Sequence, residues 1–144
     1  MFSLDVIKTR LESQLAASPF PDAVVQIAAT REPDMPRTDK PYLRIFYGDS
    51  RGLRMEELTS AASGFTSSPE FRILALEIRL QTSVEDFPAL FNIVDLAIRK
   101  WHPFPDLDIT SEYDAGFLFE LGQPLAIQNR VLTYMLTYNL VSYF

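Results

Sequence analysis

The chain has 144 residues, the length of one domain, and 47% of them are hydrophobic, which argues against general disorder. Its net charge of −6 argues against a general nucleic-acid binder, because such proteins need a basic surface to displace counterions from phosphates. The absence of cysteine excludes a disulfide framework and thiolate chemistry.

The first third of the chain predicts a helix followed by two strands. Ser3 can cap a helix whose apolar residues recur at spacings of three and four, namely Leu4, Ile7, Leu11 and Leu15. Ala23–Thr30 favours a short strand, and the proline-rich residues Arg31–Pro41 favour a loop. Tyr42–Tyr47 is rich in aromatic and branched residues, which predicts a second strand.

The polar stretch Gly48–Pro69 predicts a long connection, in which Arg54–Ala62 could form a helical turn or two. Connections of this length in a compact domain are usually functional or mobile. Phe65 would have no core to join there. We therefore expect this connection to become ordered against a partner.

The central part of the chain changes its hydrophobic period from two to about 3.6. Apolar and polar residues alternate from Phe71 to Gln81, which predicts a half-buried strand. One face of this strand holds Leu74, Leu76, Ile78 and Leu80, and the other holds Glu77, Arg79 and Gln81. From Phe87 to Trp101 apolar residues recur at spacings of three and four, which predicts a helix that Pro103 ends.

The junction between this strand and helix contains two candidate capping boxes, Thr82 with Glu85 and Ser83 with Asp86. A strand that leads directly into an amphipathic helix implies that the helix folds back on the sheet. The leucine-rich face of the strand should then pack against four residues of the helix, Phe87, Phe91, Val94 and Ile98.

The last third predicts irregular structure from His102 to Ser111, a strand at Phe117–Leu121, a turn at Gly122–Pro124 and a long strand at Val131–Tyr143. The complete order is α-β-β-β-α-β-β. This order predicts a single α+β domain, residues 1–144, with a mostly antiparallel or mixed sheet of about four to five strands and two helices packed on one face.

The sequence offers no catalytic constellation. His102 is the single histidine, and there is no phosphate-binding glycine motif and no Gly-x-Ser-x-Gly elbow. The pairs Asp106 with Asp108 and Glu112 with Asp114 could together hold a hard cation such as calcium, but they lack the spacing of a recognised calcium loop. A solvated acidic surface is the favoured interpretation, so we expect no enzyme, no metal and no cofactor.

The whole-chain pattern resembles the phage tail terminator proteins, especially those of Mu-like contractile-tailed phages and related prophages. A short N-terminal helix (Phe2–Leu15) opens the chain, and KPYLRIFYGD (Lys40–Asp49) follows a proline-rich loop. A charged strand then leads into a long helix that ends in Trp101-His-Pro, and an acidic connection follows. The ending NRVLTYMLTYNLVSYF (Asn129–Phe144) is similar to the family's closing strand.

The resemblance implies a structural protein of the virion tail, made in the host cytoplasm. Family members have a mixed or antiparallel sheet with helices on one side, and they assemble as hexameric rings. The ring caps the head-proximal end of the tail tube, stops its polymerisation and offers a surface to the neck. The implied partners are further copies of the chain, the tail tube protein and the neck or connector protein, with the sheath as a further candidate.

Two alternatives stay open from the residues alone. One is another phage neck or tail-completion protein, and the other is a small ligand-binding α+β protein whose site is not evident. No stretch approaches about 18 uninterrupted apolar residues, and the first residues lack a signal-peptide pattern. We therefore expect no membrane as a partner, and the net charge of −6 argues against a sequence-specific nucleic acid.

Charge is segregated along the chain in a way that suggests a contact between subunits. A basic group, Lys40, Arg44, Arg51 and Arg54, precedes an acidic group, Asp106, Asp108, Glu112 and Asp114. We hypothesise that the basic group of one subunit faces the acidic group of the next, with Phe65 also at a partner interface. The two groups could instead be independent solvated surfaces or meet within one chain, and part of the acidic surface could line a channel for DNA.

Overall fold

The computed structural model describes residues 2–28, 40–53, 71–103 and 116–143, and only the backbone of 51–53, 71–72 and 141–143. Two helices and six strands lie in these ranges. In chain order they are α1 (Leu4–Ala16), β1 (Val24–Ile27), β2 (Tyr42–Tyr47), β3 (Arg51–Leu53), β4 (Phe71–Ser83), α3 (Phe87–Ile98), β5 (Leu118–Gln128) and β6 (Val131–Tyr143).

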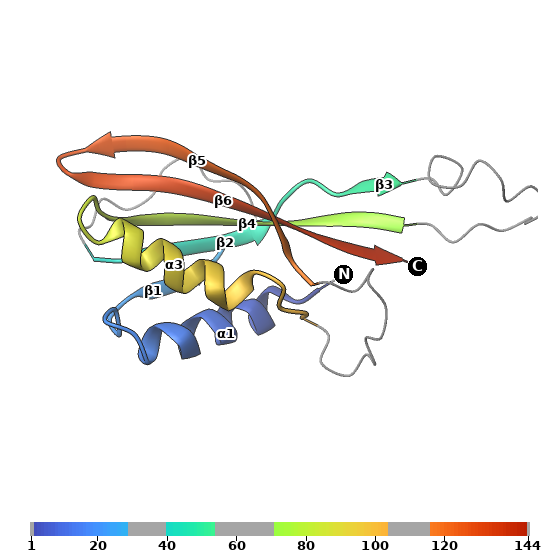
Figure 1. The fold of residues 1–144 in the computed structure, drawn as a ribbon, viewed down its shortest axis with the longest axis horizontal. Coiled ribbons are helices and arrows are strands. Elements are labelled where there is room, and N and C mark those ends of the chain that lie inside the picture. Colours follow the sequence, from blue (N-terminus) through green and yellow to red (C-terminus); the bar gives the residue numbers. More distant parts are fainter. Residues whose placement is uncertain (1, 29–39, 54–70, 104–115, 144) are drawn as a thin grey trace, which may run out of the picture.

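The strands form one mixed sheet in the order β1-β2-β4-β6-β5, with β3 pairing β4 next to β2. Only β1 and β2 are parallel, and the other pairs are antiparallel. Both helices lie on the same face of this sheet (Figure 1). The predicted α+β fold, a mixed sheet with two helices on one face, is confirmed.

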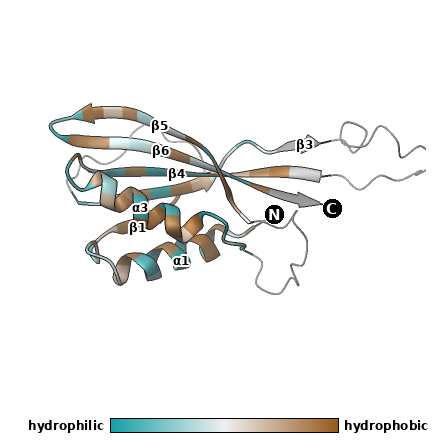
Figure 2. Ribbon diagram, viewed as in Figure 1, coloured by the Kyte–Doolittle hydropathy of each residue, from teal (hydrophilic) through white to brown (hydrophobic). Residues whose placement is uncertain are grey.

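The core lies between the two helices and the sheet. All four residues on the leucine-rich face of β4 are buried in this core, and so are Val94 and Ile98 of α3. Phe87 and Phe91 are partly buried and pack against the same cluster. From α1 the core receives the four residues that the helical period predicted, Leu4, Ile7, Leu11 and Leu15. A larger share of α3 than of α1 is hydrophobic (Figure 2), which agrees with the greater burial of α3.

The junction between β4 and α3 differs in detail from the prediction. The Asp86 N–H donates a hydrogen bond to Ser83 Oγ at 3.2 Å, so the hydroxyl of the second candidate box is used. This bond closes the turn that precedes the helix and does not cap the helix itself. The N-cap residue is Asp86, whose side chain makes no capping hydrogen bond. The helix ends at Ile98, earlier than expected, because the chain next pairs with Phe117 through Arg99.

The predicted turn at Gly122–Pro124 is wrong, because these residues continue β5. Proline is tolerated there since β5 is an edge strand with no described strand on its outer side, and two register shifts accommodate the irregular pairing. The chain reverses instead at Asn129 and Arg130, whose φ angles of 52° and 62° suit a tight hairpin turn.

The strand β3 was not expected, and it pairs with the first residues of β4 beyond the end of β2. Opposite it, β6 pairs with β4 along the full length of both strands. As a result, β3 and the adjoining ends of β4 and β6 extend past the helices (Figure 1).

The face of β4 that the alternation assigned to polar residues is also buried. Glu77 and Gln81 are each 4% exposed. Their cross-strand partners on β2 are the large side chains Phe46 and Tyr42, both themselves buried. The expectation of a half-buried strand is therefore wrong in the middle of β4, where both faces are removed from water.

Candidate functional site

The structure places only part of the predicted subunit contact. Lys40 is exposed just before β2. Arg51 is the first residue of β3, where only the backbone is described. Arg44 is only 6% exposed, so it is buried within the folded chain and does not lie on the surface that the hypothesis required. Arg54, Phe65 and the acidic group Asp106, Asp108, Glu112 and Asp114 lie outside the described residues.

The burial of Arg44 follows from its register. It lies directly opposite Arg79 on β4, on the sheet face away from the helices. Each guanidinium lies over a ring of β2, that of Arg44 5.8 Å from the centroid of Tyr42 and that of Arg79 5.3 Å from the centroid of Phe46. Stacking on aromatic faces is favourable for arginine in such partly desolvated places. We assign this arginine pair to the stability of the fold.

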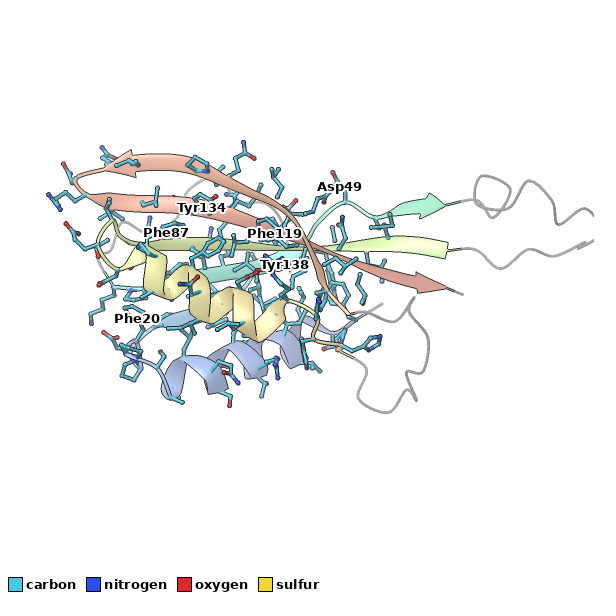
Figure 3. The ribbon with its side chains drawn as sticks, viewed as in Figure 1. Phe20, Asp49, Phe87, Phe119, Tyr134 and Tyr138 are labelled. Carbon is cyan, nitrogen blue, oxygen red and sulfur yellow. The ribbon has the colours of Figure 1, made fainter. Side chains whose placement is uncertain are left out.

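A row of aromatic rings joins α3 to the hairpin of β5 and β6 (Figure 3). The centroid of Phe87 lies 4.8 Å from that of Tyr134, and the centroid of Phe119 lies 5.6 Å from that of Tyr138. Phe91 lies between them, 6.1 Å from Tyr134 and 6.4 Å from Phe119. The row is therefore structural: it fixes the helix against the hairpin.

A partly buried polar contact completes this attachment. The Tyr138 hydroxyl donates a hydrogen bond to Asp95 Oδ1 at 2.7 Å, and Arg99 Nε donates to Asp95 Oδ2 at 3.0 Å. Tyr138 is fully buried. Burial raises the pKa of its phenol far above the ordinary value, and the hydrogen bond and charge of Asp95 raise it further. Because Asp95 and Tyr138 lie 43 positions apart, no sequence pattern indicated this contact.

Tyr138→Phe should lower the free energy of unfolding by about 1.5–3 kcal/mol at neutral pH, since the Asp95 carboxylate loses a buried donor. The raised pKa gives this difference a pH dependence. Below about pH 10, the ordinary tyrosine value, folded and unfolded wild type both keep the proton. Above it only the unfolded state releases the proton, so the advantage of wild type over Tyr138→Phe should shrink. Urea titrations of both proteins below and above about pH 10 would measure the difference in unfolding free energy, and a difference that grows with pH would contradict this prediction.

The described residues also form a pocket of about 470 Å³ between the outer face of α1 and Trp101. Its lining residues are Asp5, Val6, Thr9, Arg10, Ser13, Gln14 and Trp101. A volume in this range is typical of small-ligand and side-chain sites. The sequence reasoning missed this pocket, because Arg10 in α1 and Trp101, three residues after the end of α3, are brought together only by the tertiary fold.

Arg10 is held in the pocket by two contacts. Its Nε donates a hydrogen bond to the carbonyl oxygen of Ala97, and its guanidinium carbon lies 4.8 Å from the centroid of the Trp101 ring. Trp101 is fixed in turn by the pairing of its own segment. The Phe117 N–H donates to the Trp101 carbonyl at 3.0 Å, and the Lys100 N–H donates to the Phe117 carbonyl at 2.7 Å.

The structure also shows where the candidate metal-ligating groups of the described residues lie. His102 follows the pocket residue Trp101 in the chain but does not line the pocket. No group of three or more potential metal-ligating side chains occurs within residues 2–28, 40–53, 71–103 and 116–143. In the same ranges, neither helix has the length and apolar character needed to cross a membrane.

Comparison with models of known protein families gives no match for this chain, and no curated protein matches it significantly.

Proposed function

We propose that this protein is a structural subunit of a phage tail, which forms a hexameric ring at the head-proximal end of the tail tube. The ring ends tube polymerisation and docks the neck or connector, and the subunit is not an enzyme. The observation that carries this proposal is the order of elements on which the resemblance rests. That order places α1 first, KPYLRIFYGD around β2, the charged strand β4 leading into α3, and β6 at the end.

The surface of the subunit supports an assembly role. Of the nine exposed large hydrophobic side chains among the described residues, four lie on the single edge strand β5. They are Leu118, Leu121, Leu125 and Ile127, with exposed fractions between 41% and 68%. An edge strand with exposed apolar side chains is a surface that a partner can cover.

The strands that extend past the helices also support it. The ends of β3, β4 and β6 form a projection of the sheet that neither helix covers (Figure 1). A projection of this kind increases the reach of a subunit toward a neighbour in a ring or toward the tube.

The mass of the purified protein, measured by sedimentation equilibrium and native mass spectrometry, tests the proposal. We expect a species of six subunits that negative-stain images show as a ring. Added to polymerising tail tube protein, it should shorten the tubes and be found at one end of each. A protein that stays monomeric at high concentration and leaves tube length unchanged would refute the proposal and favour a ligand-binding role.

A further inference from the structure

We propose that the pocket of Arg10 and Trp101 binds a carboxylate of an acidic peptide segment, and that this segment is residues 104–115 of a second copy of the chain. The inference rests on the proposed ring, because it requires copies of the chain to meet. The basic side of the contact is then Arg10, which lines an open pocket, and not the buried Arg44 of the sequence-based hypothesis.

The first reason is the state of Arg10. Its Nε is engaged in the hydrogen bond to Ala97, and its Cζ lies over the ring of Trp101. The terminal Nη atoms make no hydrogen bond to another described residue. A guanidinium held in this way presents a fixed pair of N–H donors, which matches the two oxygens of a carboxylate.

The second reason is the character of the surrounding side chains. Thr9, Ser13 and Gln14 add hydroxyl and amide groups, and Val6, 40% exposed, adds an apolar contact. Asp5 is the one carboxylate in the lining, and it opposes an anionic ligand. The pocket is therefore suited to a single carboxylate that binds the terminal N–H groups of Arg10.

The third reason is charge complementarity with a segment that every copy carries. Residues 104–115 contain Asp106, Asp108, Glu112 and Asp114 and no Lys or Arg. Contact between the pocket of one copy and this segment of the next joins two different surfaces, so it is heterologous and can repeat until a ring closes. A partly exposed ion pair selects the partner and its orientation more than it supplies affinity, which the apolar side chains of β5 would supply.

The chain provides its own reporter for this pocket, because Trp101 is the only tryptophan. The probe is a synthetic peptide with the sequence of residues 104–115, which lacks tryptophan, added to the full-length protein at a concentration where it is monomeric. We expect a saturable change in the emission of Trp101. A control peptide with Asn and Gln in place of the four acids should give none.

Two changes in the pocket should move the affinity in opposite directions. Arg10→Met should weaken peptide binding about tenfold or more. Arg10→Lys keeps the charge but loses the paired donors, so its affinity for the peptide should lie between those of wild type and Arg10→Met. Asp5→Asn should strengthen binding. Equal affinity in wild type and both Arg10 variants, or equal binding of the control peptide, would overturn the inference. An equal emission change with free succinate would also overturn it, because the pocket would then be a site for small carboxylates.

Sedimentation of the same variants separates this inference from the proposed function. We expect Arg10→Met to shift assembly to higher protein concentration, with an unchanged circular dichroism spectrum. A ring that forms equally well with Arg10→Met would refute the inference and leave the proposed function standing. A wild-type protein that never assembles would refute the proposed function, and the peptide titration would still decide whether the pocket binds this segment.

Discussion

Leu76→Ala should lower the free energy of unfolding by about 2–5 kcal/mol, as measured by urea titration followed with circular dichroism. Leu76 lies in the middle of β4, with Tyr47 and Tyr138 as its neighbours on the two adjacent strands, and it is 0% exposed. Its side chain belongs to the cluster that joins the sheet to the helices. Truncation leaves a cavity there, because strands paired on both sides cannot move together to fill it.

Leu96→Ala is the matched control for this change. It removes the same atoms from a side chain of α3 that is 80% exposed, so the free energy of unfolding should change by no more than about 0.5 kcal/mol. Similar effects of the two substitutions would show that the sheet and helices do not enclose the core described above.

Gly116→Ala should lower the free energy of unfolding by about 2–5 kcal/mol. Gly116 has a φ of 76°, a left-handed conformation that costs a residue with a Cβ about 1–2 kcal/mol. The added Cβ would lie 2.6 Å from the Trp101 carbonyl oxygen and 2.8 Å from the Lys100 carbonyl carbon. Overpacking against these backbone atoms adds about 1–3 kcal/mol, because they are held by the pairing with Phe117.

The substitution Gly122→Ala provides the comparison. Its new Cβ would lie 2.6 Å from the Tyr134 hydroxyl, the far end of a side chain that needs only a small shift, and Gly122 does not have the left-handed φ of Gly116, so the loss of stability should be smaller. Gly116→Ala should also change the emission of Trp101, whose carbonyl must move, whereas Gly122→Ala should not. If the two variants are equally stable, the tight approach of residues 100–101 to Gly116 is not a feature of the folded protein.

The candidate site shows where sequence reasoning stops. The basic group was defined by residues that are close together in the sequence, but Arg44 is buried in the folded chain, opposite Arg79 of β4. Arg10 looked like an ordinary residue of the polar side of a helix. Its importance depends on Ala97, 87 positions away, which accepts its hydrogen bond, and on Trp101, over whose ring it lies.

The sequence by itself determined the elements whose signal is a local period. The bounds predicted for the strands at Tyr42–Tyr47 and Val131–Tyr143 are the observed ones, and the apolar stripe of α1 is the buried one. Alternation and helical spacing are properties of the chain within a few residues, so they can be read without knowing the neighbours.

Only the tertiary structure decided which strands are neighbours and which faces are covered. The parallel pairing of β1 with β2, the short strand β3 and the passage of β5 through Gly122–Pro124 all depend on partners elsewhere in the chain. Glu77 likewise has the alternation of a solvent-facing residue, yet it is buried beside Phe46 in the middle of the sheet. Backbone pairing and burial are satisfied between distant segments, and the local pattern of one segment does not contain them.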